Sequence, residues 1–331
     1  MQDTIETMKI AISVTTADEV EHLVRDGADE FYCGMNHPEY PFALNRREMP
    51  HGNVPTLEEM RKIVQIAHEH ERPVFVTLNK TFYTGAELNL LKELIEHLHS
   101  IGADALIVSD IGLIEMLKES GNTWRLHLSS VAAPMNSWSV KFFRQFGIER
   151  VILPRLYTSE IKKIREEHPD LEIEVLALAW YCPNYDGICS FQHDLVSAND
   201  DAYDRIVMDN ACCLEYDIEM FNEGDAERDA FFMSRIDKRF SNVFLRMSAA
   251  CEGCSVFELS RMGVDSLKIV SRLLNKQQKR KCLQFMKKCV QAVASFQKES
   301  DFIFHVKKLY KSTFGFDCNE NCYMNPTKTR A

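Results

Sequence analysis

The sequence predicts an α/β protein, a (β/α)8 TIM-type barrel with a cysteine-rich insertion between strands seven and eight. Short apolar runs alternate with helical patterns along most of the 331 residues, which is typical of parallel strands joined by helices. Eight such strands favour a closed barrel over the alternative, a doubly wound open sheet. The strands are expected at residues 9–14, 30–33, 73–78, 105–108, 125–128, 151–153, 172–178 and 266–270.

Helical patterns follow every predicted strand except the seventh. Thr16 with Glu19, and Thr56 with Glu59, have the spacing of a capping box, so helices are expected to begin at these positions. After the eighth strand, we expect one long basic helix from about residue 274 to about residue 298.

The alternation breaks after the seventh strand, where a long segment rich in Cys, Asp and Asn follows. We therefore expect a barrel over residues 8–275, with a cysteine-rich insertion at 182–254. Residues 276–331 form a C-terminal part with a helix and a cysteine-containing tail. In barrels and open sheets ligands bind beyond the carboxyl ends of the strands, so the insertion falls on the expected functional face.

Composition limits the class of protein and its partners. A content of 45% hydrophobic and 27% charged residues is typical of a globular protein. No apolar run is long enough to cross a bilayer, and the acidic first residues lack the pattern of a secretory signal, so we expect a cytoplasmic protein. The net charge of −10 gives no overall basic footprint, which makes nucleic acid a disfavoured but not an excluded partner.

Eleven cysteines without a predicted export signal are explained better by metal ligation or redox chemistry than by disulfides. Cys182 and Cys189 follow the seventh strand, and Gly187 would let the loop turn back between them. Thiolates are suited to iron–sulfur clusters and to zinc, and both metals stay open on spacing alone. The wide spacing of Cys182 and Cys189 modestly favours iron–sulfur, because structural zinc usually takes closer pairs.

Four other cysteines lie near or after the eighth strand. Cys282 and Cys289 are one heptad apart on a predicted helix and are expected in the core. Cys318 and Cys322 have metal-like spacing, and we expect a structural or lid role for the tail that carries them.

Polar and charged side chains fall at or near the predicted strand ends, where barrel enzymes place functional residues. His127 is suited to proton transfer near neutral pH. Lys268 alternates with apolar neighbours, so it should point into the barrel, where it needs a partner. Arginines at such positions can clamp carboxylates through two hydrogen bonds. The candidates are His127, Lys268 and Asp110 for catalysis, and Arg46, Asn79, Arg155 and Arg272 for substrate binding.

The segment at 174–189, EVLALAWYCPNYDGIC, resembles the signature of the U-thirty-two peptidase family, the collagenase-like peptidases. Its Cys-x4-Gly-x-Cys core matches fully. The usual aromatic, glycine, small and aliphatic residues before the core are replaced by Leu176, Ala179, Trp180 and Tyr181. Residues 27–34 and 263–269 also resemble family strands, and the resemblance covers roughly residues 8–275.

The resemblance implies chemistry other than proteolysis. Several family members bind a 4Fe-4S cluster through four cysteines and take part in hydroxylations that do not use O2. Their substrates include the ubiquinone ring and bases of transfer and ribosomal RNA, with prephenate implicated as the oxygen donor. Carried over to this chain, the cluster ligands would be Cys182, Cys189, Cys212 and Cys251, with Cys213, Cys254 and Cys33 as alternates.

The resemblance and the composition together favour one activity and leave three others open. We expect O2-independent hydroxylation of a small aromatic molecule or a peptide by an organic oxygen donor such as prephenate. One alternative is a collagenase-like peptidase, although the chain lacks His-Glu-x-x-His and Gly-x-Ser-x-Gly. The others are a non-catalytic subunit that pairs with a paralogous partner and a hydroxylase of RNA bases.

Overall fold

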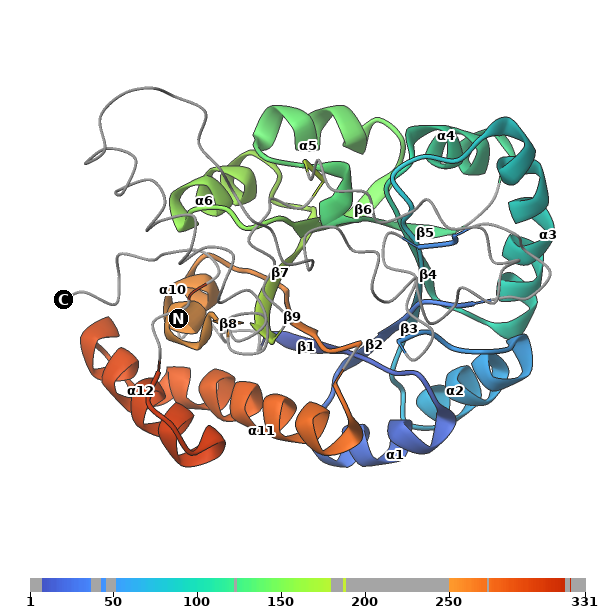
Figure 1. Cartoon of the computed structure of the whole chain (residues 1–331). Helices are drawn as coiled ribbons and strands as arrows, with labels where there is room; N and C mark the ends of the chain where they lie inside the picture. The colour runs from blue at the N-terminus through green and yellow to red at the C-terminus, as the bar shows by residue number, and fades with distance from the viewer. Residues whose placement is uncertain are drawn as a thin grey trace, which may run out of the picture.

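The computed structural model describes residues 8–36, 43–45, 52–121, 124–179, 187–188, 250–272, 274–318 and 322. Within them, eight parallel strands form a closed ring, with the order β6-β5-β4-β3-β2-β1-β9-β7 and a pairing of β7 back to β6 (Figure 1). This closure confirms the barrel and excludes the open sheet. The barrel strands are β1 (Lys9–Ser13), β2 (Glu30–Cys33), β3 (Val74–Leu78), β4 (Ala105–Val108), β5 (Arg125–Leu128), β6 (Ile148–Leu153), β7 (Glu172–Ala179) and β9 (Ser266–Val270).

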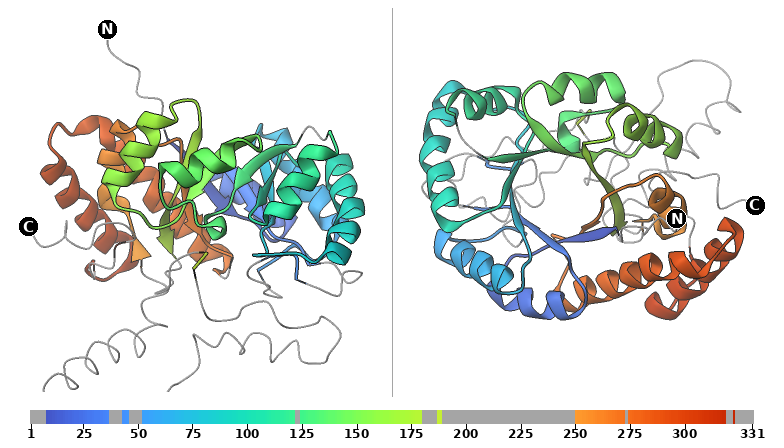
Figure 2. Two further views of the ribbon diagram at one scale, coloured as in Figure 1. Left: turned by 90° about the horizontal axis from the view of Figure 1, so that it is seen from above. Right: turned by 180° about the vertical axis from the view of Figure 1, so that it is seen from behind.

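Helices surround the strands on the outside of the ring, as the views from above and behind show (Figure 2). The first six are α1 (Ala17–Arg25), α2 (Leu57–Glu69), α3 (Gly85–Ile101), α4 (Ile111–Glu119), α5 (Ser137–Arg144) and α6 (Thr158–Glu167). Between β7 and β9 the described residues include a short strand, β8 (Ala250–Cys251), which pairs antiparallel with β7, and α10 (Val256–Arg261). Short 3-10 turns are η1 (Ser130–Ala132), η3 (Gly253–Ser255) and η4 (Val293–Ser295).

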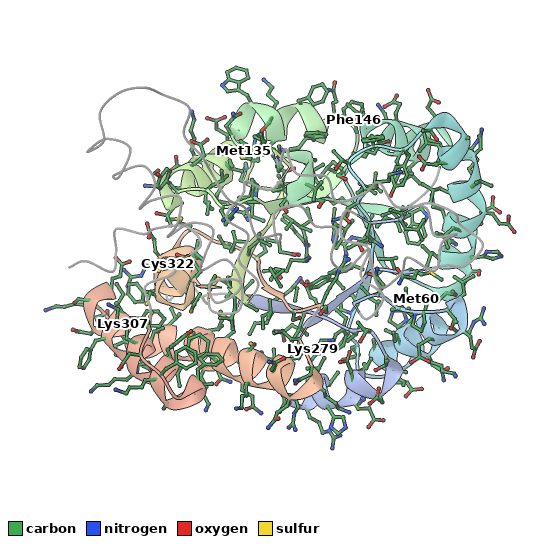
Figure 3. The ribbon with its side chains drawn as sticks, in the orientation of Figure 1. Met60, Met135, Phe146, Lys279, Lys307 and Cys322 are labelled. Carbon is green, nitrogen blue, oxygen red and sulfur yellow. The ribbon has the colours of Figure 1, made fainter. Side chains whose placement is uncertain are left out.

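The helix after β9 completes the ring. Helix α11 (Lys276–Ala292) packs against β1 and α1, and the buried ammonium of Lys279 lies 2.8 Å from the Glu19 carboxylate of α1 (Figure 3). The expected domain boundary at residue 275 therefore falls between the eighth barrel strand and its own helix.

Helices begin directly after Thr16 and Thr56 as expected, whereas the side-chain cap at Thr16 and the single long helix are wrong. Thr16 precedes α1 without a side-chain cap, because the Glu19 carboxylate instead accepts a hydrogen bond from the Thr15 N–H and pairs with Lys279. The single basic helix is in fact α11 followed by η4 and then α12 (Glu299–Phe314). The chain is extended at Phe296, whose ring lies 5.8 Å from that of Phe302, and this contact accompanies the break.

The apolar core fills the space between the strands and the helices. Leu23 of α1, Met60 of α2 and Leu94 of α3 are completely buried in it. Met60 is labelled in Figure 3. Side chains alternate along each strand, so every second one points away from the helices and into the barrel. Several of these inward-pointing side chains are charged. No helix in the described part of the chain is long and apolar enough to cross a membrane.

Candidate functional site at the mouth of the barrel

A hydrogen-bonded group that we call the mouth network lies at the carboxyl ends of β2, β3 and β9. Its members are Arg272, Asn53, Thr77 and Asn45. The Arg272 guanidinium donates to Asn53 Oδ1 at 3.3 Å and to Thr77 Oγ1 at 2.5 Å, and Thr77 also donates to Asn45. A β-carbon on Gly34 would lie 2.1 Å from Asn53 Oδ1, so glycine at this position lets the network close.

Other predicted binding residues lie along the same edge or outside the described residues. Asn79 follows β3 and donates to the Ser129 hydroxyl beyond β5 at 3.1 Å, which links two strand ends. Arg155 follows β6 and is half-buried. Arg46 lies outside the residues that the structure describes. The mouth therefore gathers Asn79 and Arg272 on one edge of the barrel, as their positions after strands predicted.

Below the mouth, a chain of ion pairs crosses the barrel interior. Lys268 donates to Glu174 at 2.7 Å, which confirms that this lysine points inward and has a partner. Arg150 contacts Glu174 at 3.0 Å and Glu30 through two hydrogen bonds of 2.7 Å. The Lys268 ammonium also lies 3.9 Å from the ring centroid of Tyr32, in a cation–π contact.

Sequence reasoning missed three members of this chain, Arg150, Glu30 and Glu174, although a signal was present. Glu30 and Glu174 are charged residues within predicted apolar strands, as Lys268 is, and Arg150 directly precedes the predicted strand 151–153. Charged side chains at such positions need partners of opposite sign, and several of them on separate strands of one barrel can pair with each other.

The buried charges adjust each other's pKa. Burial alone would raise the pKa of Glu30, but the hydrogen bonds and charge of Arg150 lower it below its usual value. Burial lowers the pKa of Lys268, while the Glu174 carboxylate opposes that shift. The network can stay ionised because each buried charge has a counter-charge in contact.

His127 lies on β5, completely buried, with its ring centroid 4.5 Å from that of Phe75. Neither ring nitrogen has a hydrogen-bond partner within the described residues. Burial lowers the pKa of His127 well below its usual value, and the charge of Arg150 lowers it further. The imidazole is therefore neutral at pH 7, so it is not poised for the proton transfer near neutral pH that its residue type predicted.

Asp110, the third catalytic candidate, is the N-cap of α4. Its Oδ1 accepts from the Leu113 N–H at 2.6 Å, and its Oδ2 accepts from the Tyr83 N–H at 3.4 Å. Both carboxylate oxygens therefore hold backbone in place. A catalytic role for Asp110 stays a prediction, and this arrangement supports a structural one.

Of the predicted cluster ligands, Cys251 is described. It ends β8 opposite Leu178, beside the strand that leads into Cys182. Its sulfur accepts from the Gly253 N–H at 3.2 Å, the kind of contact that stabilises a thiolate. The predicted ligands Cys182, Cys189 and Cys212, and the alternate Cys213, lie outside the described residues. Within the described residues, no three His, Cys, Asp or Glu side chains are placed to hold a metal ion.

The loop that joins two predicted ligands is anchored at Gly187. Its φ is +79°, as expected for a tight turn, and a β-carbon there would lie 2.4 Å from the Val131 carbonyl oxygen. This contact places Gly187 against η1, which follows β5.

Other described cysteines include the alternate ligand Cys33 and a set of thiols around Cys251. The alternate ligand Cys33 lies on the outer side of the barrel, with its sulfur 3.6 Å from that of Met60, and burial raises its pKa to about 12. Burial raises the pKa of Cys251 well above its usual range, and neighbouring thiols add to this effect. These neighbours are Cys289, the alternate ligand Cys254 and the tail residue Cys318.

Comparison with known proteins gives the family of this barrel. The family model described as "Peptidase family U32" matches residues 15–330. The chain belongs to this family. The match extends through α11 and α12, which lie beyond residues 8–275, the part of the chain whose motifs resemble the family.

Two curated relatives that the U32 chain resembles are named for RNA hydroxylation. The chain is 32% identical over 200 residues to the tRNA hydroxylation protein P of Escherichia coli (strain K12), which covers 60% of this chain and 42% of that protein. It is 31% identical over 139 residues to the 23S rRNA 5-hydroxycytidine synthase of the same strain, covering 42% of this chain and 20% of that protein. The chain thus spans less than half the length of these two relatives.

Among solved structures, the U32 peptidase Mk0906 matches with a TM-score of 0.48 and 13% identity, covering 82% of this chain and 95% of that one.

Proposed function

We propose that this U32 chain takes part in the hydroxylation of a base in RNA at the mouth of its barrel. The observation that carries the proposal is the 32% identity to a tRNA hydroxylation protein over 60% of the chain. A second relative is named for the synthesis of a hydroxylated cytidine in 23S rRNA. These names favour an RNA base over the free aromatic molecule or peptide that the sequence first predicted.

The proposed cofactor is a 4Fe-4S cluster on Cys182, Cys189, Cys251 and either Cys212 or Cys213. Cys251 fits this role, because β8 holds it beside the strand that leads into Cys182 and the Gly253 N–H donates to its sulfur. When bound, such a cluster supplies redox-active iron in a shielded site. The high pKa of the buried Cys251 thiol means that ionisation would depend on the positive charge of the metal.

The described residues of the mouth would bind and orient the reactants. The Arg272 guanidinium is fixed by Asn53 and Thr77, and it is suited to bind a phosphate or a carboxylate oxygen. Asn79 offers an amide group at the neighbouring strand end. Hydroxylation replaces C–H with C–OH and oxidises the base by two electrons. An organic oxygen donor such as prephenate would give up the oxygen atom and be reduced by the same two electrons, so O2 would not be needed.

Proteolysis has less support from the described residues. A Cys/His or Ser/His mechanism needs a nucleophile that is hydrogen-bonded to the base. His127 is the buried histidine of the mouth region, and it makes no hydrogen bond within the described part of the chain.

The test is an anaerobic reconstitution followed by analysis of RNA. The protein is purified with iron and sulfide supplied, and Mössbauer spectra report the cluster. It is then incubated with unmodified transfer RNA and prephenate, and nucleosides are examined by mass spectrometry for the gain of one oxygen atom. We expect hydroxylated nucleoside without O2. Label taken from ¹⁸O2 would refute oxygen independence, an iron-free protein would refute the cluster, and unchanged RNA would refute the substrate.

A further inference from the structure

We infer that His127 is a ligand-binding residue whose uncharged imidazole hydrogen-bonds the edge of the base that enters the barrel. The inference rests on the proposed function for the identity of the ligand. It differs from the proton-transfer role that the sequence suggested, and it makes the interior of the barrel, beyond the mouth network, part of the binding site.

The position of His127 places its ring inside the barrel. Along β5, His127 and Ser129 are two residues apart and so share the inward side of the strand. Ser129 is the residue that Asn79 contacts at the mouth. The His127 ring lies one step deeper and meets Phe75 of β3 edge to face, with an interplanar angle of 69°. The Asn79–Ser129 contact lies between the mouth and this pair, so a flat ligand would reach the pair once that contact opens.

Among the residues that the structure describes, neither ring nitrogen of His127 has a hydrogen-bond partner, although the residue is 0% exposed. Such groups are rare in folded proteins, because a buried donor or acceptor without a partner destabilises the fold. A second buried histidine shows the usual situation. The Nε2 atom of His168 lies 3.1 Å from the Ser137 hydroxyl and 3.2 Å from the Ser137 carbonyl oxygen, which can only accept. Natural proteins depart from full hydrogen bonding of buried polar groups mainly at functional or strained sites.

Burial lowers the pKa of His127, and the surrounding positive charges lower it further, so the imidazole is neutral. Four cations lower the pKa of His127 through their charge. They are Arg150, Lys268 and Lys9 on three other strands and Arg125 on β5 itself. Each of these is paired with a carboxylate of Glu30, Glu172 or Glu174. A neutral imidazole has one N–H donor and one acceptor nitrogen. A cationic ligand would meet the buried ammonium and guanidinium groups, whereas an anion finds its partner at Arg272 nearer the mouth.

The chemistry that fits His127 is therefore a planar, uncharged group with a polar edge. The edge of a pyrimidine base, with its carbonyl oxygens and N–H groups, has this character. The phosphate of the same nucleotide would remain at the Arg272 end. The arrangement would draw one unstacked base into the barrel, as enzymes that act on a base generally require.

The test uses stability and binding together, because an apolar replacement should change them in opposite directions. In His127→Leu, both unsatisfied nitrogens disappear, so the ligand-free protein should melt at the same temperature or a few degrees higher. Binding of a short RNA hairpin with an unpaired loop should weaken about tenfold, as expected for the loss of one buried hydrogen bond. His127→Gln keeps a donor and an acceptor and should recover part of the binding.

His168→Leu is the matched control, because it removes a buried histidine whose nitrogens are paired. It should lower the melting temperature and leave hairpin affinity unchanged. In addition, ¹⁵N spectra of histidine-labelled protein should show neutral His127 below pH 6.5 and a shift of its nitrogens when the hairpin is added.

The outcomes separate this inference from the proposed function. If His127→Leu melts lower by as much as His168→Leu and binds RNA normally, His127 is structural and the inference fails, while hydroxylation of RNA by the wild type would still stand. If the wild type neither binds nor hydroxylates RNA, the proposed function fails, and the base-binding role of His127 fails with it.

Discussion

Replacing Glu174 with glutamine should be among the most damaging single changes in the barrel. Glu174 is 0% exposed and contacts Lys268 at 2.7 Å and Arg150 at 3.0 Å. Arg150 would keep Glu30 and Glu172 in the variant, whereas Lys268 would lose the carboxylate that compensates its charge. Breaking a buried pair in this way costs about 3–5 kcal/mol. With an unfolding entropy of about 2 cal/mol/K per residue, that corresponds to a fall of about 4–7 °C in melting temperature.

The loss should depend on pH in a specific direction. Burial already lowers the pKa of Lys268 from its ordinary 10.5, and removal of the Glu174 charge, which raises it, should lower it further. The folded variant then binds fewer protons than the unfolded chain as the pH rises. The destabilisation of Glu174→Gln relative to the wild type should therefore be complete below the folded pKa of Lys268 and should disappear as the pH approaches 10.5.

The assay is urea unfolding of the wild type and the variant, followed by circular dichroism at neutral and alkaline pH. The double variant Glu174→Gln with Lys268→Met removes both charges and should recover most of the stability. Asp317→Asn is the control, because it breaks an exposed pair with Lys311 and should have little effect. A loss for Glu174→Gln that the second substitution does not recover, or that is constant with pH, would refute the reasoning.

Three further changes test other parts of the molecule. Cys251→Ala should abolish the visible absorption and the Mössbauer signal of the reconstituted cluster. Cys282→Ala, which removes a buried thiol of α11, should keep both signals. Equal signals from the two variants would contradict the ligand set. Gly34→Ala should displace the mouth network and therefore raise KM. Gly85→Ala is its control, because a β-carbon there meets nothing within 4 Å, and it should leave KM unchanged. Ala179→Gly should stabilise the protein by about 1 kcal/mol in urea unfolding, because φ is +83° at this residue; a loss of stability would show that the left-handed backbone there is not strained.

Local patterns in the sequence were sufficient to predict the barrel strands. The predicted segments 30–33, 105–108, 125–128 and 266–270 coincide with β2, β4, β5 and β9, and the other four differ at one end by one to three residues. Strand periodicity also indicated that Lys268 points inward. These properties depend on neighbouring residues, so they can be read along the chain.

The helix ends were harder to predict, because their partners are distant in sequence. Glu19 has the spacing to cap α1 from within, but it pairs with Lys279, on the helix that follows the last barrel strand. A tertiary contact overrode the local preference for a side-chain cap at this end. The break between α11 and α12 is different, because the contact that accompanies it joins Phe296 to the nearby Phe302.

The sequence by itself determined the barrel, the inward face of each strand and the order of the cysteines along the insertion. Only the tertiary structure decided which inward side chains meet. Arg150 binds Glu30, which lies 120 residues earlier, whereas the ring nitrogens of His127 on the adjacent strand have no hydrogen-bond partner among the described residues. The physical reason is that alternation along a strand fixes which side chains enter the barrel, whereas the stagger and closure of all eight strands fix their neighbours.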